Sequence, residues 1–268
     1  MSDILARIYQ SKARALAEEE AREPYAEVRR RADERRSERR PFAAAVRSAS
    51  GPAIIGEVKR ASPSAGLIAR NFDPSAIAGA YERAGIDCIS VLTESDHFLG
   101  ELGYLDIVRK AARRPILRKD FLTTPYQIAQ SAAYGADAVL LIVAGLQDSQ
   151  LRTNISEAAT YDLDVLVEVH DLAELERALR AGATLVGINN RDLRTFETDL
   201  SVSEYILPHV PPGITVISES GVRSPQDIAR LHVAGARGLL IGETLMRSED
   251  PAAMVRAFKA AAKNEALR

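Results

Sequence analysis

The chain has 268 residues, a formal net charge of −2 and a single cysteine, Cys88. This length suits one α/β domain, and the near-neutral charge excludes a protein that binds nucleic acid by bulk electrostatics. A single cysteine excludes an intramolecular disulfide framework and is typical of a reducing cytoplasm. The N-terminus lacks the apolar segment of a signal peptide, and no apolar run reaches the roughly 18 residues of a membrane span. We therefore expect a cytoplasmic protein with no nucleic-acid or membrane partner.

Residues 1–50 differ from the rest of the chain because they are rich in Ala, Arg and Glu and contain no strand pattern. We predict two helices, near Asp3–Ala21 and Tyr25–Ser37, followed by a helical stretch near Phe42–Ala49. Seven arginines fall within Arg29–Arg40, with acidic residues among them. This mixture favours a solvated helix face that carries ion pairs, and a phosphate or RNA patch is the alternative.

From Pro52 onward, short β-branched runs alternate with helical stretches at a mean spacing of about 26 residues. This spacing is close to one strand-loop-helix-loop unit, and near-continuous apolar strands separated by helices indicate a parallel sheet. The predicted strands are Ala53–Val58, Cys88–Leu92, Ile116–Arg118, Ala138–Ile142, Val165–Val169, Leu185–Ile188, Thr215–Ile217 and Gly238–Ile241.

A glycine ends three of the intervening helices just before the next strand, at Gly135, Gly182 and Gly235. Eight such units close into a barrel. A doubly wound sheet is the alternative, but the glycine-rich turn that it usually carries after its first strand is missing here. The sequence thus predicts an α/β fold, a (β/α)8 TIM barrel over residues 51–268, with an N-terminal helical extension over residues 1–50.

Charged residues follow the predicted strands at their carboxyl ends, where barrels of this type place their active sites. Glu57 and Lys59 are two apart and therefore share one face of a strand. Charges that converge on a site of low dielectric must pair or shift their pKa values. A salt bridge at a strand end would explain any one of these charged residues, but six such residues at successive strand ends predict one shared site. They are Glu57, Lys59, Lys119, Glu168, Arg191 and Glu219.

The loops after the last two strands have the composition of a phosphate site. Gly221 follows the seventh strand and Gly242 follows the eighth, with Glu243 directly after it. Glycine lets backbone N–H groups approach an anion, and barrels commonly bind phosphate at this position. Ordinary turn glycines are the alternative explanation.

Four segments resemble the indole-3-glycerol phosphate synthase family. They are Gly56–Ser64, Leu117–Phe121, Gly187–Leu193 and Ser218–Val222, in the family's order, and the resemblance runs from about Ile54 to Arg247. The chain departs from the family pattern at a few positions. Gly56 stands where Ala is usual, Ala65 where Lys is frequent, and Glu243 where some members have Ser. No charged catalytic position is lost.

The resemblance implies a lyase of tryptophan biosynthesis that needs no cofactor or metal. Its substrate, 1-(2-carboxyphenylamino)-1-deoxyribulose 5-phosphate, closes an indole ring with loss of CO2 and water. Lys119 is the expected acid and Glu168 the base, while Lys59 serves as second acid and carboxylate partner. The predicted catalytic residues are Lys119, Glu168, Lys59, Glu57, Asn189 and Glu219.

The resemblance also implies binding residues around this centre. The expected substrate contacts are Ser62, Pro63, Phe98, Phe121, Leu140, Arg191, Leu193, Ser220 and Leu240. For the apolar members of this set, an ordinary core position is the alternative. The expected phosphate contacts are Lys59, Ser62, Gly221, Gly242 and Glu243. The N-terminal segment resembles the extra helix that the family lays over the barrel mouth.

Two other functions are compatible with such a barrel. Phosphoribosylanthranilate isomerase would need a Cys/Asp pair, but Cys88 begins a strand, at the end away from the site. A barrel that only binds a phosphorylated metabolite would require a lost acid or base. The four histidines lack the spacing of metal ligands. A monomer is the default expectation, because no interface pattern is visible in the sequence.

Overall fold

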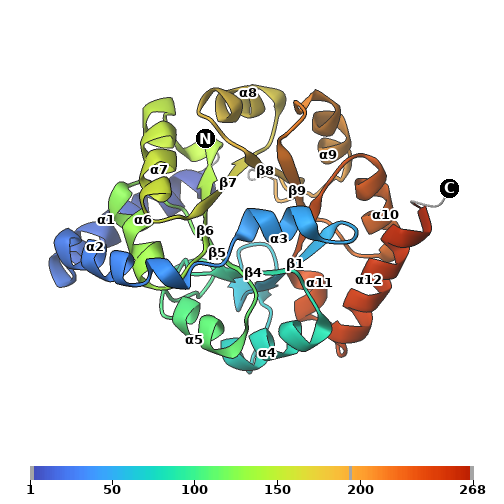
Figure 1. Cartoon of the computed structure of the whole chain (residues 1–268), viewed down its shortest axis with the longest axis horizontal. Coiled ribbons are helices and arrows are strands. Elements are labelled where there is room, and N and C mark those ends of the chain that lie inside the picture. The colour runs from blue at the N-terminus through green and yellow to red at the C-terminus, as the bar shows by residue number, and fades with distance from the viewer. Residues whose placement is uncertain (1–2, 193–194, 266–268) are drawn as a thin grey trace.

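The computed structural model describes residues 3–192 and 195–265. In this part of the chain, parallel strands close a barrel in the order β1-β10-β9-β8-β7-β6-β5-β4. The predicted (β/α)8 barrel is confirmed, and Figure 1 shows its ring of helices. The barrel strands are β1 (Ala53–Val58), β4 (Cys88–Leu92), β5 (Ile116–Lys119), β6 (Ala138–Ile142), β7 (Asp164–Val169), β8 (Leu185–Asn189), β9 (Thr215–Glu219) and β10 (Gly238–Ile241).

Helices follow the strands on the outside of the barrel, and a small hairpin of β2 (Ala61–Ser62) and β3 (Gly66–Leu67) follows β1. The glycines predicted to end helices all have positive φ, at Gly135, Gly182 and Gly235. The outer helices are α4 (Pro74–Ala84), α5 (Tyr104–Ala111), α6 (Pro125–Ala133), α7 (Asp148–Thr160), α8 (Leu172–Arg180), α9 (Ser201–Ile206), α10 (Pro225–Val233), α11 (Glu243–Met246) and α12 (Pro251–Glu265). Short 3-10 turns lie at η1 (Arg36–Glu38), η2 (Val143–Gly145) and η3 (Leu207–His209). No described helix is long and apolar enough to cross a membrane.

Alternation along the strands divides the apolar residues into two clusters. In β1, Ala53 and Ile55 belong to the cluster inside the barrel, whereas Ile54 and Val58 belong to the cluster beneath the outer helices. The same period of two turns Glu57 to the inside, next to its neighbours Ile55 and Ala53. The alternation therefore decides which charged residues reach the barrel mouth.

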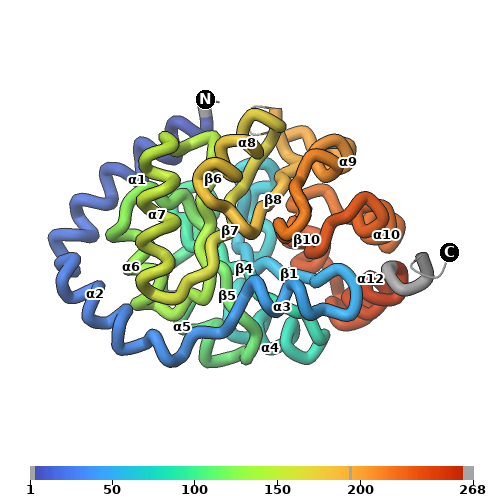
Figure 2. The backbone as a smooth tube through the Cα atoms, turned by 45° about the horizontal axis from the view of Figure 1, so that its top comes forward, coloured from blue at the N-terminus to red at the C-terminus, as the bar shows by residue number. Residues whose placement is uncertain are grey.

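The N-terminal extension contains α1 (Asp3–Arg22), α2 (Tyr25–Glu34) and α3 (Phe42–Ser48). Leu5 and Ile8 of α1 join the inner cluster from one end of the barrel. Phe42 and Val46 of α3 join it from the other end, where the Phe42 carbonyl oxygen lies 3.9 Å from the Sγ of Cys88. Figures 1 and 2 show α3 lying across the barrel, with α1 and α2 along one flank. The extension thus contributes to both ends of the barrel and does not lie over the mouth alone.

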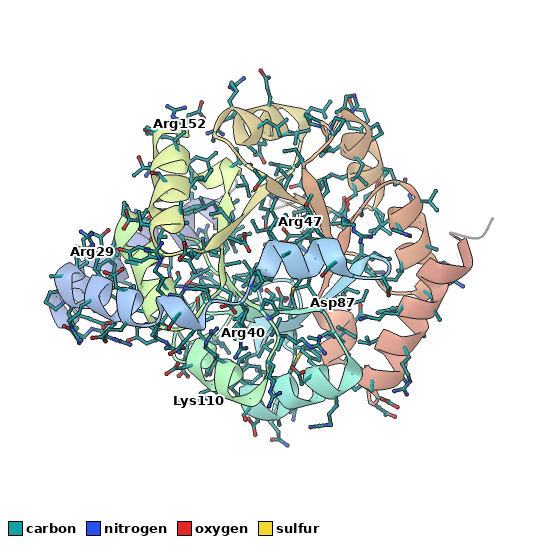
Figure 3. All side chains as sticks on the ribbon, viewed as in Figure 1. Arg29, Arg40, Arg47, Asp87, Lys110 and Arg152 are labelled. Atoms are coloured by element: carbon teal, nitrogen blue, oxygen red, sulfur yellow. The ribbon has the colours of Figure 1, made fainter. Side chains whose placement is uncertain are left out.

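Arginines attach this extension to the barrel. Arg39 donates to the carbonyl of Ala132 at the end of α6, and Arg40, labelled in Figure 3, donates to that of Ala112 after α5. Cations are favourable at helix C-termini, where carbonyl groups lack partners. Arg30, by contrast, pairs with exposed glutamates on its own helix. The predicted solvated face is therefore wrong for Arg39 and Arg40, which are half-buried and dock the extension onto the barrel.

Gly56 in β1 is explained by its neighbour Tyr81 on α4. A Cβ atom at position 56 would lie 2.9 Å from the Tyr81 ring. The Tyr81 hydroxyl donates to the Glu57 carbonyl oxygen at 3.1 Å, which holds the ring in place. The departure from alanine at this position therefore makes room for a large ring against the strand.

We predict that Gly56→Ala lowers the free energy of unfolding by about 1–3 kcal/mol, the usual cost of overpacking a core. Urea denaturation followed by circular dichroism measures the change. Gly103→Ala is the matched control, because no atom lies within 4 Å of the added Cβ and the backbone φ there is −62°. Equal stability of the two variants would refute the packing explanation.

Candidate active site

One cavity of about 380 Å³ opens at the carboxyl ends of the strands. Every predicted site residue that the structure describes lines this cavity. They are Glu57, Lys59, Ser62, Pro63, Phe98, Lys119, Phe121, Leu140, Glu168, Asn189, Arg191, Glu219, Ser220, Gly221, Leu240, Gly242 and Glu243. Leu193 lies outside the described residues.

Lys119 lies between two buried carboxylates at the centre of the cavity floor. Its Nζ is 2.6 Å from Glu168 Oε2 and 2.9 Å from Glu219 Oε2. The three side chains come from β5, β7 and β9, which are every second strand of the barrel. Strands with equivalent inward positions therefore bring together residues that lie 49 or more apart in the sequence.

The charges of Lys119, Glu168 and Glu219 shift one another's pKa values. Burial opposes charge on Lys119, but the two carboxylates outweigh it and raise the pKa of the lysine. Burial also opposes charge on Glu168, but Lys119 outweighs it and lowers the pKa of that carboxyl. For Glu219, burial and the negative charge of Glu168 outweigh Lys119 and raise the pKa to about 7. The cluster thus holds an ammonium group, a carboxylate, and a third group that titrates near neutral pH.

A second ion pair lies beside the first. Lys59 Nζ is 2.6 Å from Glu57 Oε2, and both side chains are almost fully buried. Gly242, at the end of the neighbouring strand β10, leaves this pair its space, since a Cβ there would lie 2.2 Å from Glu57 Oε2. The cavity therefore presents two ammonium groups, each held by a carboxylate.

Gly187 in β8 likewise leaves space for the carboxylates that hold Lys119. Its inward position faces Glu219, and an added Cβ would lie 2.0 Å from Glu219 Oε1. Asn189, two residues further along the same face, donates to Glu168 Oε1 at 3.1 Å and accepts from the Arg191 backbone N–H. Strand β8 thus provides both the space and the orientation that the carboxylates need.

The remaining predicted contacts surround these charges. Gly221 has a φ of +88°, and the residue before it, Ser220, also has a positive φ of +65°. The Glu243 carboxylate is turned toward Arg247, at 2.9 Å, so only its backbone N–H suits an anion. The rings of Phe98 and Phe121 lie 6.0 Å apart on the apolar wall.

Helix α1 closes the apolar side of the cavity. Ile4, Leu5 and Ile8 line it. Tyr9 packs on Gly145 so closely that a Cβ there would lie 2.0 Å from the ring, and its ring meets Phe121 edge-on at 5.7 Å. The predicted extension therefore contributes directly to the cavity through its first turns.

A buried ion pair fixes α1 next to the end of β5. Lys12 Nζ lies 2.9 Å from Asp120 Oδ1, and Asp120 directly follows Lys119. Asp120 also pairs with Arg118 and accepts a hydrogen bond from the Thr93 hydroxyl. The effect of its cationic partners outweighs that of burial and lowers the pKa of Asp120. This anchor was not predicted, because nothing in the sequence indicates that Lys12 reaches a strand end 108 residues away.

Sequence reasoning also missed cavity residues in the loops. Arg223 and Arg247, in the loops that follow β9 and β10, line the cavity, as do Phe196 and Thr198 in the loop after β8. His170 lies behind Glu168, with Nε2 3.4 Å from Glu168 Oε1. The strand alternation, extended by two residues past Glu168, is the signal that could have found His170.

Cys88 lies far from this chemistry. It is the first residue of β4, at the opposite end of the barrel, and burial raises the pKa of its thiol. It therefore cannot supply the Cys/Asp pair of an isomerase. Among the described residues, no three His, Cys, Asp or Glu side chains are grouped so as to hold a metal ion.

Comparison with known proteins shows the family to which the chain belongs. Residues 5–258 match the family model "Indole-3-glycerol phosphate synthase". The chain belongs to this family. It is 46% identical over 254 residues to the indole-3-glycerol phosphate synthase of Acidithiobacillus ferrooxidans, covering 94% of this chain and 96% of the relative. It is 50% identical over 198 residues to that of Caldanaerobacter subterraneus subsp. tengcongensis, covering 74% and 77%. The resemblance found in the sequence is confirmed.

Solved structures outside the family share only the fold. The chain superimposes on 3-hexulose-6-phosphate synthase from Salmonella typhimurium with a TM-score of 0.65 at 13% identity, covering 80% of this chain and 99% of that one. Thiamine phosphate pyrophosphorylase from Pyrococcus furiosus gives a TM-score of 0.60 at 14% identity, covering 80% and 96%. What sets the family's site apart is therefore its side chains rather than the barrel.

We predict that Gly187→Ala lowers turnover with little loss of folded protein. The added methyl group displaces Glu219, which moves the Lys119 ammonium group that it holds. Steady-state kinetics and a thermal melt measure the two effects. Gly103→Ala, with no atom within 4 Å of the new Cβ and a backbone φ of −62°, controls for the methyl group itself. Unchanged turnover in Gly187→Ala would show that the site accommodates the methyl group without displacing Glu219 and Lys119.

Glu219 also predicts a pH dependence of stability. Between its ordinary pKa of 4.5 and about 7, the folded protein holds a proton that the unfolded chain has released. This contribution is complete below about pH 4.5 and is lost as the pH rises through about 7. Glu219→Gln has no such proton to lose. The Tm of this variant minus the Tm of the parent should therefore increase from pH 5 to pH 8. A Tm difference that stays constant across this range would count against the shift.

Proposed function

We propose that this cavity closes an indole ring on 1-(2-carboxyphenylamino)-1-deoxyribulose 5-phosphate, the reaction for which the family is named. The observation that carries the proposal is Lys119 held between Glu168 and Glu219, beside a second ammonium group on Lys59. Ring closure needs an acid at the ketone oxygen, and the later dehydration needs a base and another acid. This cavity offers those three groups within one small volume.

Lys119 is the proposed acid of the first step. As the ring carbon that bears the carboxylate attacks the ketone carbon, negative charge develops on the ketone oxygen. An ammonium group kept charged by two carboxylates can donate a proton to this oxygen and stabilise the charge in a site shielded from water. Loss of CO2 then restores the aromatic ring.

Glu168 is the proposed base of the dehydration. Its pKa is lowered by Lys119, so it is ionised and able to accept a carbon-bound proton. Lys59 donates a proton to the departing hydroxyl group and pairs earlier with the substrate carboxylate. Glu57 pairs with Lys59 and orients it, and Asn189 orients Glu168 through its amide.

The two ends of the substrate require different surroundings. The phosphate would lie against the backbone of Gly221, Gly242 and Glu243, with Ser62 and Lys59 beside it, on the side where Arg223 and Arg247 line the cavity. Arg191 and Ser220 would hold the sugar. The anthranilate ring would lie against the apolar wall, which is formed by Pro63, Phe98, Phe121, Leu140 and Leu240 together with α1.

The proposal includes the setting of the enzyme. Every acid and base named above belongs to one chain, which supports a monomer that works without a cofactor. The family's place in amino-acid biosynthesis supports a cytoplasmic location. Incubation of the pure protein with the carboxyphenylamino sugar phosphate tests the activity, with indole fluorescence and released CO2 as readouts. Folded protein that yields neither would refute the proposal.

We predict that Lys119→Ala and Glu168→Gln each lower kcat by a factor on the order of 10² or more, as expected for general acid–base groups. Lys110→Ala and Glu176→Gln are matched controls, because these side chains are 80% and 70% exposed on outer helices. The controls should keep full activity. Near-parent turnover in both cavity variants would remove these residues from the mechanism.

A further inference from the structure

His170 lies between the active-site cavity and a second cleft. It follows β7 and lines the cleft together with Glu174, Asn189 and Arg191, whereas Glu168 lines only the cavity. The His170 side chain is 17% exposed, so it reaches water on the side of the cleft. It therefore occupies the one described position that touches the proposed base from outside the substrate cavity.

The contacts of His170 form a continuous path. Its Nδ1 lies 3.0 Å from Glu174 Oε2, and its Nε2 lies 3.4 Å from Glu168 Oε1. The other oxygen of Glu168 lies 2.6 Å from Lys119 Nζ. Four ionisable groups thus connect the second cleft to the acid beneath the substrate. Among the described residues, Nε2 makes no hydrogen bond, and the Glu168 Oε1 atom at 3.4 Å is the carboxylate oxygen it can reach.

The surroundings keep the imidazole protonated. Burial lowers the pKa of His170, but Glu168 and Glu174 outweigh it and raise the pKa to about 10. The ring therefore carries a proton on both nitrogens at neutral pH and serves as a donor rather than an acceptor. The other charged or titratable groups near it, from α1 and from the cleft, are Tyr9, Asp171, Arg191, Asp192, Glu197 and Asp199.

The proposed reaction consumes a proton. One proton goes to the ketone oxygen and a second goes to the departing hydroxyl group, whereas the base removes only one from carbon. The substrate carboxylate leaves as neutral CO2 and releases no proton. Each turnover must therefore take up one proton from water, while α1 and the substrate cover the cavity.

We propose that His170 is the proton-uptake relay of this enzyme, an inference that rests on the proposed function. The Nε2–H bond of the imidazolium breaks and its proton passes to Glu168 Oε1. Glu168 then gives a proton from Oε2 to the neutral amine of Lys119, which becomes ammonium again. The proton that Glu168 took from carbon restores Lys59 by way of water in the cavity once the product has left, so the net proton taken up in each turnover is the one that enters through His170. His170 regains its proton from water in the second cleft, on the side of Glu174. His170 acts only through Glu168 and is therefore a positioning residue, not a catalytic one.

A purely structural role for His170 makes a different prediction. The ring and its backbone N–H both contact Glu174, which ties β7 to α8. If this were the whole role, replacing the ring would disturb Glu168 and slow the first chemical event. A relay leaves the first event intact, because Lys119 is already protonated in the resting enzyme.

His170→Asn in the full-length protein separates these roles. Rapid mixing of excess enzyme with substrate measures the first turnover, and excess substrate measures the steady state. We expect a first turnover within about twofold of the parent and a steady-state kcat lower by about tenfold or more, with KM lowered in parallel and kcat/KM unchanged, because only a step after the chemistry is slowed. Added imidazole should restore the steady-state rate in proportion to its concentration. His209→Asn, at an exposed position in η3, is the matched control and should match the parent.

A second variant tests the outer part of the path. Glu174→Gln keeps the shape of the contact but removes its charge, so the steady-state rate should fall by less than in His170→Asn, again with an intact first turnover. A thermal melt of each variant verifies that it folds. This pair keeps the test decisive if the asparagine variant is poorly folded.

Two results would overturn the relay. One is a steady-state rate of His170→Asn equal to that of the parent at low buffer concentration. The other is a first turnover slowed as much as the steady state, with no response to imidazole. Either result leaves the proposed function standing if the parent enzyme still forms indole product. A parent enzyme that forms no product refutes the proposed function instead.

Discussion

The site depends on one buried ammonium group between two carboxylates. Lys119 keeps Glu168 ionised, the carboxylates keep Lys119 charged, and Glu219 relieves the excess of negative charge by titrating near neutral pH. Buried charges are tolerated only when they are paired in this way. The glycines of β8 and β10 are part of the same constraint, because their missing side chains provide the space for the carboxylates.

The barrel and the inward charges were predictable because both follow from regular periods. Strand alternation turns Glu57, Lys119 and Glu168 to the same side, and parallel strands bring their carboxyl ends together. The loops and the extension follow no such period. The pairing of Lys12 with Asp120 and the place of His170 depend on the path of the chain between elements, which local sequence does not encode.

The helices of the N-terminal extension were predicted, but not which end of the barrel each of them contacts. The composition of the extension indicates charge and helix propensity. Its arginines, however, bind backbone carbonyl groups at the ends of α5 and α6, and backbone groups cannot be recognised from the side chains in the sequence. Arg39 and Arg40 pass along this underside, and α3 then closes the barrel opposite the substrate. One segment thus contributes side chains to the inner core at both ends of the barrel.

The position of α1 has a practical consequence for handling the protein. Ile4 and Leu5 line the cavity, so any peptide fused ahead of them begins at the entrance used by the substrate. Helix α12 lies on the opposite flank of the molecule from α1 and α2 (Figure 1). Purification tags and surface tethers therefore belong at the carboxyl terminus, where they leave the entrance unobstructed.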